Sequence, residues 1–185
     1  MKRLKFTFAA ALLVASTLVL AEVPAKARVC AACHGTEGIS NNPLWPDLAG
    51  QKPGYLAVQL AAFRDGLRQN VQMAPFVKDL SDADIQSIAT YYSQLPAKAA
   101  ANGDAAQVSV GENLSAYCKA CHGMKGKPAA SVWPNLAGQQ SAYLAKQLAA
   151  FKSGERTSPQ MQTVVAGFGE TEFAALAAYY SQLAP

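Results

Sequence analysis

The chain has 185 residues, of which 51% are hydrophobic and 15% are charged, and its formal net charge at pH 7 is +4. Three of its 16 basic residues lie within the first five positions, so residues 22–185 hold 13 basic and 12 acidic side chains, a net charge of +1. A nucleic-acid-binding protein would need a clustered basic surface. The nearly neutral main body therefore argues against nucleic acid as a partner.

Residues 1–21 have the composition of a secretory signal peptide. A basic head precedes an apolar run from Phe6 to Leu20, and the small residue Ala21 offers a cleavage site. The apolar run is short for a membrane span of about 20 residues, although an uncleaved membrane anchor is an alternative. We therefore expect export to the periplasm. If the segment is not cleaved, the protein would remain associated with the membrane.

The chain contains two copies of the pentapeptide C-x-x-C-H, at residues 30–34 and 118–122. This spacing is the signature of covalent haem c attachment, because two thiols about one helical turn apart can form thioether bonds with the two vinyl groups of one porphyrin. The histidine that follows can then bind the iron. The expected attachment residues are Cys30, Cys33, Cys118 and Cys121, and the expected proximal iron ligands are His34 and His122.

Other uses of paired cysteines explain these motifs less completely. A single C-x-x-C occurs in thioredoxin-like redox proteins and in zinc sites, and four cysteines could form two disulfides. None of these alternatives accounts for a histidine directly after each second cysteine. The motifs use all four cysteines and both histidines, so we expect two haem c groups with their irons and no thiol or imidazole left for another metal.

The chain repeats itself with an offset of 88 residues. The offset relates Cys30 to Cys118, and it relates pairs of tryptophan, proline, tyrosine, phenylalanine and methionine residues without a gap. Residues 46–66 and 134–154 are identical at 14 of 21 positions. The stretch between the copies is poor in large apolar residues, and a proline and a glycine interrupt it. We expect a signal peptide at 1–21, domains at 22–95 and 111–185, and a linker at 96–110.

Helical periodicity dominates each repeat. Residues 55–63 place Leu56, Leu60 and Phe63 on one stripe, and residues 81–95 place apolar side chains at the i, i+3, i+4 and i+7 positions of a helix. Ser81 also has the spacing of a capping box with the acidic residue three positions on. No convincing alternating strand pattern occurs. We therefore predict an all-α fold of two small domains, each wrapped around its haem, since a unit of this size supplies only a marginal apolar core.

A six-coordinate haem needs a second axial ligand, and with both histidines used the candidates are methionines. Met73 lies 39 residues after His34, and Met161 lies 39 residues after His122. Met124 is too close to its histidine to reach the opposite face of the ring. We therefore expect Met73 and Met161 to be the distal iron ligands.

The loop after each predicted methionine ligand differs between the repeats. Pro75 can stiffen the first loop, whereas Thr163 occupies the matching position of the second. The second iron is therefore expected to have a softer bond to its methionine and a reduction potential different from that of the first.

Longer motifs also occur in both repeats: Cys-x-x-Cys-His-Gly, Trp-Pro-x-Leu-Ala-Gly-Gln, Tyr-Leu-x-x-Gln-Leu-x-x-Phe, Gly-x-Arg before the methionine and a closing Tyr-Tyr-Ser-Gln-Leu. With these motifs in two tandem class I cytochrome c units, the sequence resembles the dihaem cytochrome c4 family. The resemblance implies a periplasmic electron carrier, often associated with the membrane, that passes single electrons between respiratory donors and a terminal oxidase. We expect a monomer with redox proteins as partners and no enzymatic activity of its own.

The resemblance also implies roles for residues around the haems. Pro46 and Pro134 match the proline whose carbonyl accepts the Nδ1–H of the ligand histidine. Arg68 and Arg156 match the arginine of the Gly-x-Arg motif, which could contact haem propionates or groups at the domain interface. The alternative is that both arginines are solvated charges at helix ends. Four further matching positions, which fit either a site or ordinary packing, are Gln51, Gln139, Tyr55 and Tyr143.

The first unit departs from the family pattern at its start. The second unit has seven residues of helix-forming sequence before Cys118, whereas cleavage after Ala21 would leave the first unit only residues 22–29. We expect its first helix to be short or frayed, which puts in doubt its packing against Tyr91 and Tyr92.

Two other functions remain open on the sequence. A dihaem peroxidase-like enzyme would need an open iron and a distal acid–base residue, and the chain has no spare histidine for that role. A dihaem cytochrome subunit of a periplasmic dehydrogenase, such as a sulfide-oxidising flavocytochrome, would share the same tandem units. Co-purification with a flavoprotein would separate this second alternative from a free carrier.

Overall fold

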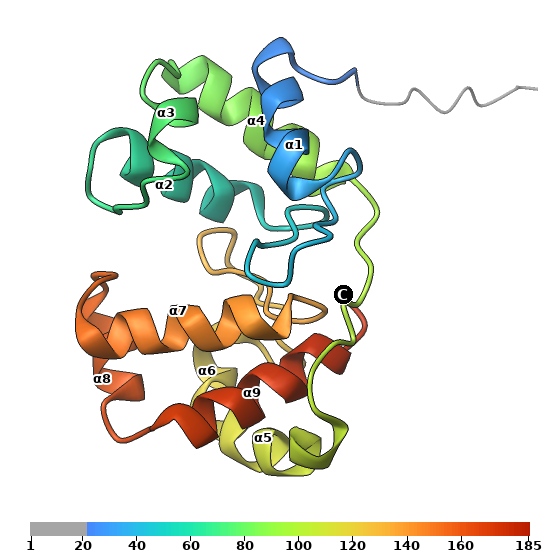
Figure 1. Ribbon diagram of the computed structural model, residues 1–185, viewed down its shortest axis with the longest axis vertical. Helices are drawn as coiled ribbons and strands as arrows, with labels where there is room; N and C mark the ends of the chain where they lie inside the picture. Colours follow the sequence, from blue (N-terminus) through green and yellow to red (C-terminus); the bar gives the residue numbers. More distant parts are fainter. Residues whose placement is uncertain (1–21) are drawn as a thin grey trace, which may run out of the picture.

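The computed structural model describes residues 22–185, and the predicted signal peptide at 1–21 lies outside this part. Within the described residues the regular secondary structure is entirely helical, which confirms the predicted all-α class. Two helical units are stacked one above the other and are joined by a single connection along one side (Figure 1). Across residues 22–185, no helix combines the length and the apolar character needed to cross a membrane.

The first unit is built around two longer helices. Its elements are η1 (Ala25–Cys30), α1 (Ala31–His34), α2 (Pro53–Arg64), α3 (Ala74–Val77) and α4 (Asp82–Gln94). The helices predicted at 55–63 and 81–95 correspond to α2 and α4, which pack against each other. The apolar stripe of α4 is almost fully buried, and its core members include Ile85, Ile88 and Tyr92.

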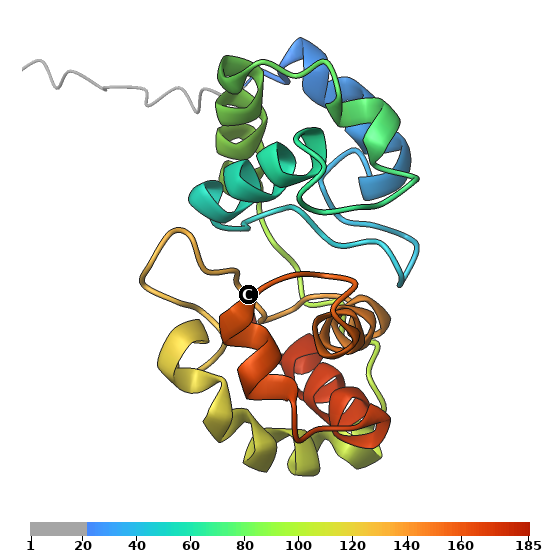
Figure 2. The ribbon, with the colours of Figure 1, turned by 90° about the vertical axis from the view of Figure 1, so that its left-hand side faces the viewer.

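The second unit repeats this arrangement with a longer helical lead. Its elements are η2 (Ala105–Gln107), α5 (Val108–Leu114), η3 (Ser115–Tyr117), α6 (Lys119–His122), α7 (Ser141–Ser153), α8 (Pro159–Val165) and α9 (Glu170–Gln182). Helix α9 packs against α5 and α7, and Leu176, Ala177 and Tyr180 lie in its buried stripe. The two units turn loops toward each other across their boundary (Figure 2).

The connection between the units is attached to the second unit. Asn102 Nδ2 donates a hydrogen bond to Gln140 Oε1 at 2.6 Å. Residues 105–110, which composition assigned to the linker, are already helical. The reason is local: Asp104 Oδ1 accepts an N–H bond in the first turn of η2, and Val108 packs against the second apolar core.

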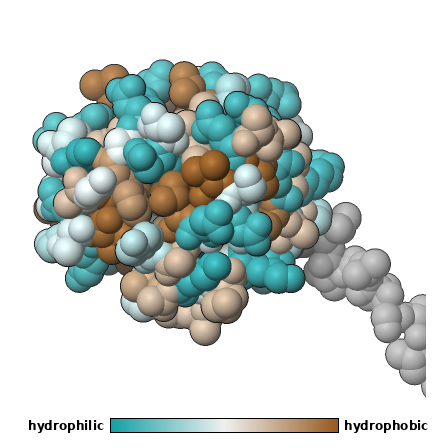
Figure 3. All heavy atoms as spheres, turned by 90° about the horizontal axis from the view of Figure 1, so that it is seen from below, coloured by the Kyte–Doolittle hydropathy of each residue, from teal (hydrophilic) through white to brown (hydrophobic). Residues whose placement is uncertain are grey.

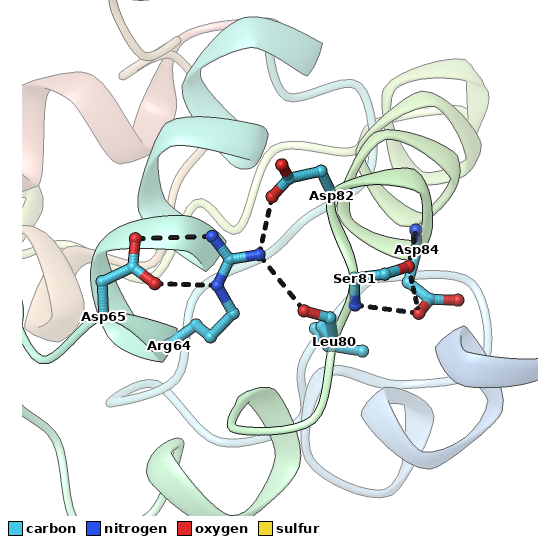
Figure 4. A network of polar contacts seen from close by, with 6 residues as sticks. All are labelled: Arg64, Asp65, Leu80, Ser81, Asp82 and Asp84. Carbon is cyan, nitrogen blue, oxygen red and sulfur yellow. Dashed lines mark hydrogen bonds and ion pairs between the residues drawn. The ribbon is translucent and has the colours of Figure 1, made fainter.

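The start of α4 is fixed by polar contacts within the first unit (Figure 4). Ser81 Oγ accepts the N–H of Asp84 at 3.1 Å, and the Asp84 carboxylate accepts the N–H of Ser81 at 3.0 Å, so the predicted capping box is confirmed. Arg64, at the end of α2, donates to Asp82 Oδ1 at 2.7 Å and to the carbonyl of Leu80 at 3.2 Å. These bonds tie the end of α2 to the start of α4.

The segments before the two C-x-x-C-H motifs differ in length, as the sequence indicated. In the first unit this segment is η1, a 3-10 helix of six residues, whereas the second unit has three consecutive helical elements from 105 to 117. Ala27 of η1 is nevertheless only 1% exposed, and its carbonyl accepts the O–H of Tyr92 at 3.5 Å. The short segment therefore still packs against α4.

Gly111 marks a close approach of α5 to α9. A Cβ atom at this position would lie 1.9 Å from the carbonyl oxygen of Ala175 and 2.8 Å from the Cβ of Tyr179. We expect Gly111→Ala to lower the free energy of unfolding by about 2–3 kcal/mol, because the overpacking outweighs the gain of about 0.5–1 kcal/mol from replacing a helical glycine. Denaturant unfolding of the purified protein measures this change.

The matched control is Gly167→Ala. A Cβ atom at Gly167 would have nothing within 4 Å, so its effect should stay within about 0.5 kcal/mol. Equal stability of the two variants would contradict the tight contact between α5 and α9.

Candidate functional site

Each C-x-x-C-H motif forms one helical turn that ends at a glycine with a positive φ angle. Helices α1 and α6 end at His34 and His122, and Gly35 and Gly123 follow with φ angles of 79° and 78°. A Cβ atom at these glycines would meet main-chain carbonyl oxygens at 2.0 and 2.3 Å, so only glycine fits there. This exit turns the chain sharply after each histidine and leaves both imidazoles buried.

Both histidines are held by a proline carbonyl twelve residues further along the chain. His34 Nδ1 lies 2.8 Å from the carbonyl oxygen of Pro46, and His122 Nδ1 lies 3.2 Å from that of Pro134. A carbonyl oxygen only accepts hydrogen bonds, so each Nδ1 carries the proton and donates it. Each Nε2 therefore keeps its lone pair and can bind a metal ion.

Burial lowers the pKa of both imidazoles, which favours the neutral ring that a metal ion requires. At His34 the hydrogen bond to Pro46 opposes this decrease in pKa, and so does the charge of Asp47. At His122 the hydrogen bond to Pro134 is the opposing effect. The surroundings of the two histidines thus differ by one carboxylate.

One continuous cavity of about 1180 Å³ runs through both units. Its walls are mainly apolar, and each unit contributes two cysteines, a histidine and a methionine to them. The structure therefore brings the predicted attachment and ligand residues of each unit to one cavity, and these residues are Cys30, Cys33, His34, Met73, Cys118, Cys121, His122 and Met161.

The three methionines of the described chain have different surroundings. Met73, which precedes α3, packs against the first core, and Met161, within α8, packs against the core that contains Phe151. Both line the cavity. Met124 is 72% exposed. The structure thus separates the two methionines predicted as ligands from the one that the sequence argument set aside.

A network of arginine, glutamine and tyrosine side chains from both units lies on the cavity. Arg68 donates to Gln59 Oε1 at 2.7 Å, to Gln147 Oε1 at 2.7 Å and to the hydroxyl of Tyr143 at 3.2 Å. Its guanidinium carbon also lies 4.5 Å from the centre of the Phe63 ring. Arg68 therefore binds its own unit and the other unit together.

Arg156 makes the same contacts with the units exchanged. It donates to Gln147 Oε1 at 2.8 Å, to Gln59 Oε1 at 2.8 Å and to the hydroxyl of Tyr55 at 3.0 Å, and it lies 4.4 Å from the Phe151 ring centre. The interface is therefore close to two-fold symmetric. The alternative of solvated charges at helix ends is wrong for both arginines.

Two glutamines hold the main chain of the opposite unit. Gln51 Oε1 accepts the N–H of Asn135 at 2.7 Å, and its Nε2 donates to the Asn135 carbonyl at 3.0 Å. Gln139 makes the same pair of bonds with Asp47, at 2.8 and 2.9 Å. Both glutamines are 6% exposed. They are thus contacts between the units rather than packing positions within one unit.

Several functional residues were not recognised from the sequence. Gln59 and Gln147 accept hydrogen bonds from both arginines, and each follows a tyrosine of the same network by four residues. Because residues four apart share one helix face, the repeated Tyr-x-x-x-Gln spacing was the available signal. Asp47 and Gln140 carried no such signal, since their counterparts in the other unit are residues of a different type.

The residues on the cavity fit a covalently bound haem in each unit. Each end of the cavity offers two thiols one helical turn apart, an imidazole with a free Nε2 and mainly apolar walls. None of the four cysteines, all of which lie in residues 22–185, forms a disulfide. These features define the class: a c-type cytochrome with two haem sites.

Comparisons with known proteins agree with this class and name the family. A model described as "Cytochrome C oxidase, cbb3-type, subunit III" matches residues 23–91, and one described as "Cytochrome c" matches residues 108–184. Cytochrome c4 of Pseudomonas aeruginosa is 35% identical over 173 residues, which cover 86% of each chain. The crystal structure of reduced recombinant cytochrome c4 from Pseudomonas stutzeri matches with a TM-score of 0.80 at 33% identity, covering 85% of this chain and 95% of that one.

The chain therefore belongs to the cytochrome c4 family, and it carries two covalently bound haem c groups. It is an electron-transfer protein rather than an enzyme, as are its relatives, so the peroxidase-like alternative is wrong. A further relative is the thiosulfate dehydrogenase electron acceptor of Thiomonas intermedia, which is 38% identical over 149 residues, covering 74% of this chain and 69% of the relative.

Proposed function

We propose that the protein is a periplasmic carrier that moves single electrons from respiratory-chain donors to a terminal oxidase, and that each iron is bound by one histidine and one methionine. The observation that carries this proposal is the pairing on one cavity of His34 with Met73 and of His122 with Met161. Each histidine is buried with its Nδ1 proton engaged. The chain has no third histidine that could take the place of either methionine.

A haem held in this way supplies an iron that changes between Fe(II) and Fe(III) by one electron. The chain fixes the orientation of both imidazoles through Pro46 and Pro134, excludes water with apolar walls, and offers thioether sulfur, which favours Fe(II). We also propose that Arg68 and Arg156 contact haem propionates. In residues 22–185 neither arginine forms an ion pair with a carboxylate, so an anionic partner would be favourable.

The rim of the cavity suits brief contact with another redox protein. Several large apolar side chains that line the cavity are also exposed, namely Leu67, Val71, Phe76, Tyr117, Val132 and Trp133. Apolar side chains also gather in patches among hydrophilic ones on the face at the second unit's end (Figure 3). Docking of a partner at this rim would bury only a small area, as in other transient electron-transfer complexes.

The test is the optical spectrum of the purified, reduced protein before and after addition of carbon monoxide, with haem counted on the same sample. We expect two haems per chain and no spectral change, because methionine closes both irons. The reduced protein should then be oxidised by membranes that contain a terminal oxidase. Carbon monoxide binding by half of the haem, or no oxidation by such membranes, would contradict the proposal.

A second candidate function is the acceptance of electrons from a thiosulfate dehydrogenase. The relative from Thiomonas intermedia, which carries that name, favours it. This candidate is a specific form of the dehydrogenase-linked alternative. Rapid reduction of the oxidised protein by thiosulfate in the presence of a thiosulfate dehydrogenase would favour the second candidate, and its absence would favour the respiratory donors.

A further inference from the structure

The two units differ by one buried charge next to an iron-binding histidine. Asp47 in the first unit corresponds to Asn135 in the second. Their main-chain groups are held alike, because Gln139 and Gln51 each bind the N–H and the carbonyl of the corresponding residue at 2.7–3.0 Å. The Asp47 residue is only 6% exposed. The two sites therefore differ in charge while sharing one backbone arrangement.

Burial raises the pKa of the Asp47 carboxyl, whereas its hydrogen bonds with Gln140 and Ser40 oppose this rise. The geometry of these contacts fits the ionised form. Oδ1 accepts the main-chain N–H of Ser40 at 2.7 Å, and Gln140 Nε2 lies 3.1 Å from Oδ1 and 3.3 Å from Oδ2. The Gln140 oxygen is engaged by Asn102 at 2.6 Å, which keeps the amide nitrogen directed at the carboxylate. All of these groups donate, so a protonated carboxyl would find no acceptor among them.

Within residues 22–185, no basic side chain is paired with this negative charge, since none of the ion pairs includes Asp47. Its neutral partners satisfy its oxygens without cancelling its field. Because the site is buried, that field is screened less than the field of a surface charge.

Asp47 lies close to the histidine that is proposed to bind the first iron. Asp47 directly follows Pro46, whose carbonyl accepts the Nδ1–H of His34 at 2.8 Å. Asp47 is also among the residues that line the cavity. Asn135 occupies the same place beside Pro134 and His122, and it contributes no charge.

We propose that Asp47 is a fixed negative charge that lowers the reduction potential of the first haem, attached at Cys30 and Cys33, below that of the second. This inference rests on the ligation of the first iron by His34 proposed above. An oxidised haem carries one more positive charge than a reduced one, so a nearby anion stabilises Fe(III). A single electron on the protein then resides mainly on the second haem, which gives internal electron transfer a direction from the first unit to the second.

The test is the midpoint potential of each haem in the full holoprotein, measured by spectroelectrochemical titration, with the haems assigned by NMR. We expect Asp47→Asn to raise the potential of the first haem and to reduce the equilibrium constant for transfer to the second haem about tenfold, or about 59 mV for a one-electron couple. Asp47→Ser should shift the potential in the same direction, because it also removes the charge but has a different shape.

The control variant is Asp79→Asn in the same unit. The Asp79 side chain is 80% exposed, so solvent and salt screen its charge, and both potentials should stay unchanged. An unchanged gap between the haems in both Asp47 variants would overturn the proposal, whereas carbon monoxide binding by the wild-type protein would overturn only the ligand assignment. A softer bond between iron and Met161 would also separate the potentials, but that separation would survive removal of the Asp47 charge.

Discussion

Replacing Met73 by alanine is expected to open the first haem to carbon monoxide while the second haem stays closed. About half of the haem absorbance of the reduced protein should change on addition of the gas, since the chain holds two haems. The potential of the first haem should fall, because the thioether ligand that favours Fe(II) is lost. Met161→Ala should produce the mirror result at the second haem.

Stability changes and ligand loss can be separated in this experiment. Truncation of a partly buried methionine costs about 2 kcal/mol in the free energy of unfolding, so the variants should remain folded in mild conditions. Met124→Ala provides the matched control, because Met124 is 72% exposed and should affect neither carbon monoxide binding nor either potential. If the irons of Met73→Ala and Met161→Ala stayed closed to carbon monoxide, another group would have to be the distal ligand.

The sequence was informative about contacts that lie within one unit. The C-x-x-C-H spacing fits one helical turn, and the equal offsets of Met73 and Met161 from their histidines selected two further residues of the cavity. The family resemblance added Pro46 and Pro134, which also line it. The longer helices followed from apolar periodicity. Such features depend on local geometry, which a repeat preserves in both copies.

Contacts between the units could not be predicted in the same way. Gln51 reaches Asn135 across 84 positions, and Gln139 reaches Asp47 across 92. These pairs exist only because two docked surfaces meet, and docking has no periodic signature in a single sequence. An aspartate in a loop is expected to be exposed. Asp47 is instead buried against Gln139 and Gln140 of the other unit.

The arginine network gives this interface an unusual electrostatic character. Two guanidinium groups share two glutamine oxygens, since Gln59 and Gln147 each accept from both Arg68 and Arg156. Neutral acceptors and aromatic faces satisfy each cation, but no carboxylate of residues 22–185 pairs with either one. Removal of one arginine would relieve some repulsion between the two cations, yet it would also leave a tyrosine hydroxyl without its cross-unit donor. The loss of hydrogen bonds should dominate, because bonds from a charged donor contribute about 1.5–3 kcal/mol each.

We therefore expect Arg68→Ala to lower the free energy of unfolding of the holoprotein by about 3 kcal/mol, through the lost bonds to Gln59, Gln147 and Tyr143. Arg68→Lys should recover only part of this loss, because an ammonium group lacks the planar fork that reaches several acceptors at once. Denaturant unfolding measures the stability, and hydrogen exchange at the boundary between the units reports whether the interface opens first.

Arg64→Ala is the control for this experiment, because Arg64, at the end of α2, belongs to the same unit as Arg68 but forms all of its hydrogen bonds within that unit. Its ion pair partners, Asp65 and Asp82, have side chains that are 47% and 89% exposed, and exposed pairs contribute little to stability. Arg64→Ala should therefore destabilise the protein clearly less than Arg68→Ala and should leave hydrogen exchange at the boundary unchanged. If the two variants lost the same stability, the cross-unit bonds of Arg68 would be no stronger than a surface ion pair, and the two units would have to be held together mainly by the glutamine contacts to Asp47 and Asn135.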